Sequence, residues 1–166
     1  LENKKWGIIG LGTIGKSVAK IAESFGCKVC YYSTSGDNFD TDYIQVGFDE
    51  LLSTSDVISI HCPLNEKTEN LISLEEMEIM KDKTILLNLG RGGIINESDL
   101  AIILDNKELY CGLDVVKKEP IEADSPLRKI KNTERLILTP HIGWASVEAR
   151  KRLIKGVISN IKEHVL

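Results

Sequence analysis

Short apolar runs alternate with helical patterns along almost the whole chain, and this alternation limits the fold more than any other feature. Apolar runs predict strands over residues 4–10, 27–32, 56–64, 83–90, 109–116 and 135–140. Helical spacing predicts helices over residues 13–26, 48–55, 73–80, 96–108 and 146–166, with Ser73 and Asn96 at two of the N-termini. Because such strands separated by helices form parallel sheets covered on both faces, we expect a doubly wound α/β fold of Rossmann-like architecture.

The size and charge of the chain limit its partners. Residues 1–166 have the length of one domain, with no linker or repeat. Lys and Arg are scattered among Asp and Glu, with a net charge of -4, so we expect no nucleic acid and no membrane partner. Because no apolar run approaches the roughly 20 residues of a membrane span and no leader is visible, we expect a cytoplasmic protein that binds a small molecule.

The four cysteines include a pair, Cys27 and Cys30, whose spacing resembles that of a redox or zinc motif. The pair lies inside the predicted strand "CKVCYY", where side chains three apart point to opposite faces. We therefore expect unpaired core cysteines, as in a reducing compartment, and no metal site.

A glycine motif, "GLGTIG", links the first predicted strand to the first predicted helix. In this context Gly10 permits a tight turn, Gly12 lets the backbone approach a pyrophosphate, and Gly15 lets the helix lie close to the strand. A pyrophosphate can then bind the free N–H groups at the helix N-terminus. The motif predicts a dinucleotide site; an ordinary glycine turn is the alternative.

The end of the second predicted strand bears on the choice of dinucleotide. An Asp or Glu there binds the adenosine ribose and excludes a 2′-phosphate. This chain has Ser33 and Thr34 in "YYSTSG", with neither an acid nor an arginine beside them. The choice between NAD and NADP therefore stays open, and the two residues could also simply form a turn.

Several unusual residues follow predicted strands, so the parallel topology places them on one edge of the sheet, where ligands collect. These residues are Gly10, Pro63, Arg91, Asp114 and His141. Arg91 lies between glycines after a buried strand, and its planar guanidinium suits a carboxylate ligand. A surface arginine in a glycine turn is an equal alternative.

Glu119 and His141 are the other candidates for chemistry. Glu119 precedes Pro120 in a charged loop, where most glutamates only face water. His141 follows Pro140, which restricts the backbone, and Gly143 just beyond it permits close approach of a ligand. A lone histidine at a strand end is more often structural than catalytic. His141 therefore has to be interpreted together with the other unusual residues on this edge of the sheet and their order along the chain.

Five ordered motifs are similar to the NAD-binding domain of the D-isomer-specific 2-hydroxyacid dehydrogenase family. They are "KKWGIIGLGTIG", "HCPLNEKTENLI", "LLNLGRGGIIN", "GLDVVKKEP" and "LTPHIGWAS". The resemblance implies that Arg91 binds the substrate carboxylate, that His141 is the acid/base, and that Glu119 pairs with His141. These roles suit the residue types, because reduction of a 2-oxo acid needs a proton as hydride arrives.

The same resemblance implies the rest of a cofactor site for NAD or NADP. It adds Thr13 and Ile14 at the pyrophosphate turn, Asp114 as a partner of the nicotinamide carboxamide, and Pro63, Leu89 and Gly90 as lining residues. The "WAS" after "HIG" is similar to the glycerate or hydroxypyruvate reductase branch, in which Trp144 would shape a pocket. Packing of Trp144 at a protein interface is an equally good interpretation.

Family members are longer than this chain and carry a substrate domain built from flanking segments. The resemblance therefore implies that residues 1–166 are the nucleotide-binding domain only, able to bind cofactor but inactive or weakly active alone. It also implies a homodimer that uses the final helix and the loops around "KEPIEADSPLRKIKN". A dinucleotide-sensing, corepressor-like protein without turnover is the alternative function.

Overall fold

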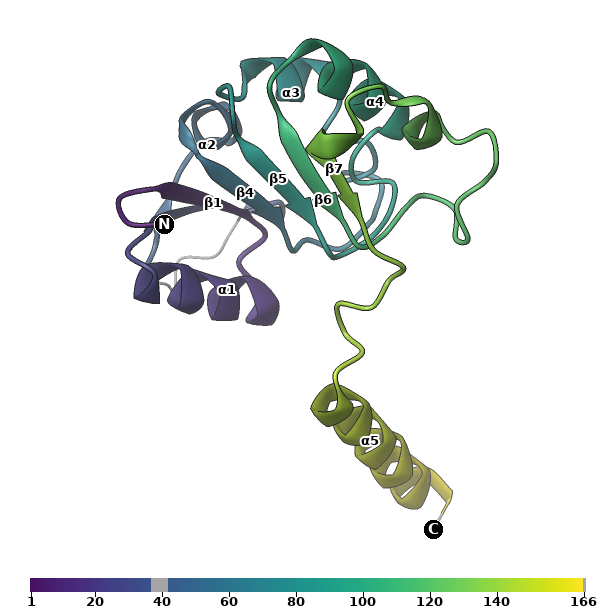
Figure 1. The fold of residues 1–166 in the computed structure, drawn as a ribbon. Helices are drawn as coiled ribbons and strands as arrows, with labels where there is room; N and C mark the ends of the chain where they lie inside the picture. Colours follow the sequence, from purple (N-terminus) through teal and green to yellow (C-terminus); the bar gives the residue numbers. More distant parts are fainter. Residues whose placement is uncertain (37–41, 166) are drawn as a thin grey trace.

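Seven parallel strands form one sheet in the computed structural model, which describes residues 1–36 and 42–165 (Figure 1). The strands are β1 (Lys5–Ile9), β2 (Lys28–Tyr32), β3 (Ile44–Gln45), β4 (Val57–Ile60), β5 (Ile85–Asn88), β6 (Tyr110–Leu113) and β7 (Leu136–Leu138). Their order is β3-β2-β1-β4-β5-β6-β7, so the chain changes direction across the sheet between β1 and β4. Such a switch point opens a crevice at the carboxyl ends of the two strands.

Helices cover both faces of this sheet, which confirms the predicted doubly wound architecture. The α-helices are α1 (Thr13–Ser24), α2 (Phe48–Thr54), α3 (Leu74–Ile79), α4 (Glu97–Asn106) and α5 (Val147–Val165), and the short 3-10 turns are Pro126–Lys129 and Thr133–Arg135. Figure 1 shows α1 on one face and α2, α3 and α4 on the other. Every predicted helix and strand is present, with β3 in addition. Residues 37–41 of the sequence lie outside the described residues.

Two of the helices begin at the residues that their sequence predicts. At α3, Ser73 and Glu76 form a capping box, in which the backbone N–H of Ser73 donates to Oε2 of Glu76 over 2.9 Å. At α4, Oδ1 of Asn96 accepts from the backbone N–H groups of Ser98 and Asp99. These caps satisfy N–H groups that a helix leaves without partners in its first turn.

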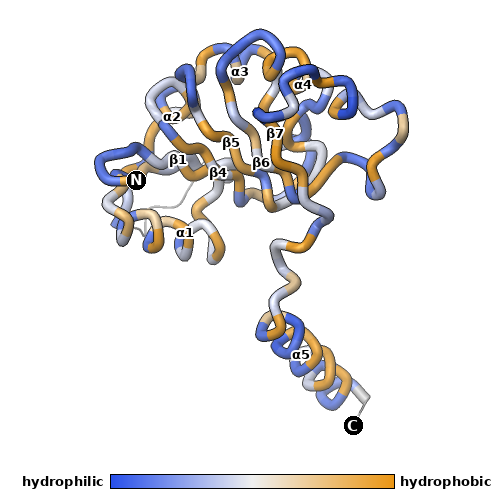
Figure 2. The backbone as a smooth tube through the Cα atoms, in the orientation of Figure 1, coloured by the Kyte–Doolittle hydropathy of each residue, from blue (hydrophilic) through white to orange (hydrophobic). Residues whose placement is uncertain are grey.

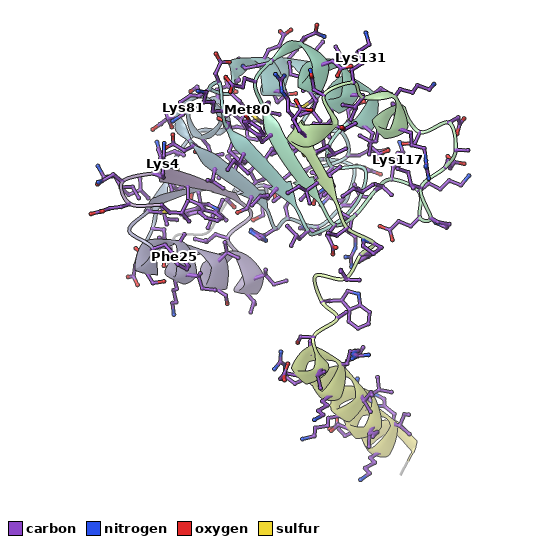
Figure 3. The ribbon with its side chains drawn as sticks, viewed as in Figure 1. Lys4, Phe25, Met80, Lys81, Lys117 and Lys131 are labelled. Atoms are coloured by element: carbon purple, nitrogen blue, oxygen red, sulfur yellow. The ribbon has the colours of Figure 1, made fainter. Side chains whose placement is uncertain are left out.

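The hydrophobic core lies mainly between the sheet and the helices α2, α3 and α4. A smaller cluster, which includes Ile8 and Ala19, lies under α1. The four cysteines are all buried and free, as predicted. Near the amino ends of the strands, Lys4 and Lys81 both pair with Asp56. The two lysines are labelled in Figure 3.

Helix α1 buries its small residues and exposes its large ones. Gly15, Ala19 and Ala22 are buried, whereas Ile14 is 68% exposed. Phe25, which directly follows the helix and is labelled in Figure 3, is 60% exposed. A Cβ on Gly15 would lie 2.3 Å from the carbonyl oxygen of Gly10, so the helix lies too close to β1 for a larger side chain. This close packing brings the N-terminus of α1 against the end of β1.

Helix α5 projects away from the sheet after the loop that carries His141 (Figure 1). Its apolar side chains are exposed along its length. Figure 2 shows the hydrophobic residues of this helix as orange bands that recur along the tube. These side chains are Leu153, Ile154, Val157, Ile158 and Ile161. Among residues 1–36 and 42–165, no helix combines the length and the hydropathy that a membrane span requires.

Candidate functional site

The glycine turn between β1 and α1 has the geometry of a phosphate cradle. Gly10 has a φ of +91°, and a Cβ there would lie 2.7 Å from the backbone nitrogen of Cys62. A Cβ on Gly12 would meet nothing within 4 Å, so this glycine is not required by protein packing. The first turn of α1 contains no acidic side chain and Gly12 offers no side-chain cap. The N-terminus of α1 is therefore open to an anionic group.

A cavity of about 900 Å³ extends from this turn to the end of β2. Gly10, Gly12, Ser33, Thr34 and Pro63 line it, so it collects five of the predicted cofactor residues. The hydroxyls of Ser33 and Ser35 lie 3.2 Å apart, and Glu66 and Lys67 also line the cavity. The cavity therefore offers hydroxyl groups and charges of both signs. We refer to this first cavity as the hydroxyl-lined cavity.

A second cavity, of about 780 Å³, lies beside the first and has a different lining. It is lined by Ile14, Leu89, Gly90, Arg91, Gly143 and Trp144. His61, Cys62 and Pro63 line both cavities, so the two meet at the end of β4. Together they have the form expected for a long ligand with two different halves. We refer to the second as the arginine cavity.

His141 and Glu119 form an ion-pair arrangement in a third cavity, of about 350 Å³. Nδ1 of His141 lies 2.7 Å from Oε2 of Glu119. The hydrogen bond from His141 lowers the pKa of Glu119, so this carboxylate is ionised at neutral pH and accepts the Nδ1 proton. Nε2 of His141 makes no hydrogen bond within the described residues and is available for proton exchange. The sequence-based pairing of these two residues is therefore present in the structure.

Asp114 fixes the loop that carries His141. Its Oδ1 accepts hydrogen bonds from the hydroxyl of Thr139 and the backbone N–H of Ile142, and its Oδ2 accepts from the N–H of Gly143 over 2.7 Å. Burial alone would raise the pKa of Asp114, but these hydrogen bonds hold it below its ordinary value. A Cβ on Gly143 would lie 2.9 Å from Oδ2. The contact with Asp114 thus favours glycine at position 143.

His141 itself has left-handed backbone, with a φ of +54°. Few residues other than glycine adopt this region, and they do so where the surroundings enforce it. Besides the bonds to Asp114, the indole N–H of Trp144 donates to the carbonyl of His141 over 3.1 Å. Trp144 is still 51% exposed and lines the arginine cavity, so it both fixes the turn and faces the cavity.

The turn that carries Arg91 is held by Asn88, a residue that the sequence patterns did not single out. The Asn88 side chain donates to the carbonyl of Arg91 over 2.8 Å and accepts from the N–H of Gly90 over 3.0 Å. Asn88 is 1% exposed, which makes these bonds necessary. The sequence signal that could have identified Asn88 is its position as a polar residue at the end of the buried run "TILLN". Arg91 remains exposed, and among the described residues its guanidinium donates only to the neighbouring carbonyl of Gly90.

The structure brings some predicted residues together and leaves others apart. Glu119 joins His141, and Asp114 joins Gly143, whereas Arg91 lines a different cavity from His141. Thr13 lies exposed in the first turn of α1. Within the described residues, no group of three or more His, Cys, Asp or Glu side chains could hold a metal ion.

A doubly wound sheet with an open glycine turn and paired cavities at its switch point defines a dinucleotide-binding domain. Residues 1–143 match the family described as "D-isomer specific 2-hydroxyacid dehydrogenase, NAD binding domain". The chain belongs to this family, which confirms the resemblance inferred from its motifs.

Individual relatives agree with this assignment. The chain is 45% identical over 168 residues to hydroxypyruvate reductase of Blautia hydrogenotrophica, an alignment that covers 98% of this chain and 51% of the relative. It is also similar to the NAD-bound formate dehydrogenase of Staphylococcus aureus, with 34% identity, a TM-score of 0.86, and coverage of 98% and 48% of the two chains.

A third match is an acyclic imino acid reductase in complex with NADPH and D-Arg, with 34% identity, a TM-score of 0.87, and coverage of 99% of this chain and 52% of that one. The chain thus spans about half the length of the relatives that it matches. These relatives are reductases and dehydrogenases, so they do not favour the sensing alternative.

Proposed function

We propose that residues 1–166 are the nucleotide-binding domain of an NAD(P)-dependent D-2-hydroxyacid dehydrogenase. The substrate that we propose is a small 2-oxo or 2-hydroxy acid of the hydroxypyruvate/glycerate type. The observation that carries the proposal is the His141–Glu119 pair at the edge of the sheet where the glycine turn also lies. The identity of 45% to a hydroxypyruvate reductase supports the choice of substrate.

The residues of the two larger cavities fit a nicotinamide dinucleotide. Gly12, Thr13 and Ile14 would hold the pyrophosphate with the N–H groups of the first turn of α1, because Gly12 leaves open space there. Ser33 and Thr34 would bind the adenosine ribose, and Pro63, Leu89, Gly90 and Gly143 would line the remainder. Oδ2 of Asp114 accepts one hydrogen bond from Gly143 and retains capacity to accept from a carboxamide.

The bound nicotinamide would supply the hydride that reduces the 2-oxo carbon, or accept it in reverse. His141 would donate a proton from Nε2 to the carbonyl oxygen, since Nδ1 is held by Glu119. Glu119 would orient the imidazole through the hydrogen bond that it accepts from Nδ1. Arg91 would bind the substrate carboxylate through two parallel hydrogen bonds, once its single bond to the Gly90 carbonyl is exchanged.

The adenosine end of the site would accept NAD and NADP alike. Ser33 is a neutral residue at the position where an acid would exclude a 2′-phosphate, and it is 7% exposed at the end of β2. Lys67 lines the same cavity and could partner a phosphate, whereas Glu66 opposes one. Relatives with each cofactor, an NAD-bound formate dehydrogenase and an NADPH-bound imino acid reductase, share this fold.

Two further parts of the proposal concern the whole protein. A longer chain would supply the substrate-binding wall opposite Arg91, and two copies would associate as a dimer through α5 and the loops around residues 118–132. The exposed apolar side chains of α5 support such an association. A cytoplasmic setting would suit the four free cysteines. Light scattering of the full-length protein tests the dimer, which a monomer at micromolar concentration would contradict.

The test of function is NADH and NADPH oxidation by the full-length protein with a panel of 2-oxo acids. We expect turnover with hydroxypyruvate or glyoxylate, and poor or no turnover by residues 1–166 alone. Absence of turnover with every acid, despite cofactor binding, would favour the sensing function. Rates from residues 1–166 that equal those of the full-length protein would contradict the proposed division of domains.

A further inference from the structure

Three polar side chains on one face of the sheet form a hydrogen-bonded series that the proposed chemistry leaves unused. The indole N–H of Trp6, on β1, donates to Oγ of Ser59 over 2.9 Å. Oγ of Ser59, on β4, lies 3.0 Å from Nε2 of His61. Ser59 is 2% exposed, so its hydroxyl proton has to be accepted by a protein atom. We refer to this series as the Trp6–Ser59–His61 relay.

The relay determines which nitrogen of His61 carries the proton. Oγ of Ser59 already accepts from Trp6, and Nε2 of His61 is the one acceptor for its hydroxyl among the described residues. The Ser59 hydroxyl therefore donates to Nε2, which leaves the proton of a neutral imidazole on Nδ1. Burial lowers the pKa of His61, which keeps the ring neutral at neutral pH. Nδ1 has no hydrogen-bond partner within the described residues and is a donor without an acceptor.

The place of His61 indicates what that acceptor is. Its backbone N–H donates to the carbonyl of Ile9 over 2.8 Å, one residue before the glycine turn begins. His61 lines both the hydroxyl-lined cavity and the arginine cavity. Because these cavities suit the two halves of a dinucleotide, the part of the ligand beside His61 is the pyrophosphate that joins the halves.

We propose that Nδ1–H of His61 binds the nicotinamide-side phosphate of the dinucleotide's pyrophosphate, and that Trp6 and Ser59 hold the ring in the orientation and tautomer that this needs. The inference rests on the proposed dinucleotide function and adds a side-chain contact to the backbone N–H groups of α1. It makes His61 a binding residue, and makes Ser59 and Trp6 positioning residues that act through it.

Two amide substitutions test the roles of the two ring nitrogens of His61 separately. Asn places its amide near the position of Nδ1, whereas Gln places it near the position of Nε2. We expect His61→Asn to keep most of the affinity for NADH, and His61→Gln and His61→Ala to lose about tenfold, the usual effect of removing a hydrogen bond to a charged group. Titrations of residues 1–166 by fluorescence and calorimetry measure these affinities, with thermal unfolding to show that each variant is folded.

ADP and AMP serve as probes that differ only in the second phosphate. We expect His61→Ala to weaken binding of ADP and leave that of AMP within about twofold. Ser59→Ala and Trp6→Phe should weaken NADH binding when His61 is present, and have little effect when position 61 is already Ala. A structural role for His61 would instead weaken AMP and ADP equally.

The outcomes distinguish this inference from the proposed function. If His61→Ala and His61→Gln bind NADH as the wild type does, or if AMP and ADP lose affinity equally, the role of His61 is wrong while the dinucleotide site stands. If wild-type residues 1–166 bind neither NADH nor ADP, both proposals are wrong. A loss confined to ADP and NADH, rescued by Asn, supports the assignment.

Discussion

Nδ1 of His141 lies 2.7 Å from Oε2 of Glu119, although the two residues are 22 positions apart and belong to different loops. The pair joins the loop after β6 to the loop after β7 at the edge of the sheet where the glycine turn lies. With Nδ1 occupied, the Nε2 side of the ring is the one that can exchange a proton with a ligand. This relationship is what distinguishes a candidate enzyme from a domain that only binds a nucleotide.

Substitution of His141 should separate catalysis from cofactor binding. In the full-length protein we expect His141→Ala to lower kcat by about 10²–10⁴-fold, the range for a general acid or base, with little change in the Kd for NADH. Glu119→Gln should lower kcat by at least about tenfold, because it removes the charge that orients the imidazole. Glu122→Gln is the matched control, since Glu122 pairs with Lys118 in the same loop region. Unchanged kcat in His141→Ala would refute the proton-transfer role.

Asp114 should affect stability as well as activity. In Asp114→Asn, the new amide group would present N–H donors to the N–H of Gly143, so we expect a loss of about 1–3 kcal/mol in the free energy of unfolding. Urea denaturation of residues 1–166 measures this. Asp82→Asn, an exposed carboxylate before β5, is the control and should change the free energy by less than about 0.5 kcal/mol. An equal effect of the two substitutions would contradict the anchoring role of Asp114.

The pH dependence of stability provides an independent check on Asp114. Its pKa is lower in the folded chain than its ordinary value, so its contribution is complete above the unfolded pKa and is lost as pH falls through the folded pKa. We therefore expect the wild type to lose stability below about pH 4, and Asp114→Asn to lose less over the same interval. Parallel stability curves for the two proteins would show that Asp114 is not responsible.

The arrangement of elements was predictable because hydrophobic periodicity and glycine positions depend on local sequence. The caps at Ser73 and Asn96, the order of strands and helices, and the common edge of the site residues all follow from such patterns. The pairing of Glu119 with His141 came only from the resemblance to a family, since nothing local in "KKEP" points to a histidine 22 residues later.

Other features depend on contacts across the sheet and could not be inferred. The three bonds that Asp114 accepts from the loop after β7 exist only because β6 and β7 are neighbours. The exposure of Ile14 and the close contact of Gly15 with Gly10 are likewise visible only in the folded chain. Hydrophobic spacing alone identifies a helix but does not reveal that small residues form its buried face.

Cofactor preference should respond to a single acid at the end of β2. We expect Ser33→Asp to lower the affinity for NADPH by at least about tenfold and to leave that for NADH equal or higher, because a carboxylate binds ribose hydroxyls and repels a 2′-phosphate. Ser33→Asn is the neutral control of the same size and should change both affinities alike. Fluorescence titration with each cofactor measures the ratio. An unchanged ratio in Ser33→Asp would place the adenosine ribose elsewhere.

The central claim, that the glycine turn before α1 binds a dinucleotide, is tested most directly by comparing two glycines. Gly12 and Gly47 both precede a helix in extended backbone, and at both a new Cβ would meet nothing within 4 Å. Both Val variants should therefore fold. In NADH titrations of residues 1–166 we expect Gly47→Val to bind like the wild type and Gly12→Val to lose at least about tenfold in affinity, because its side chain occupies the phosphate position. Equal affinity of Gly12→Val and the wild type would contradict the account.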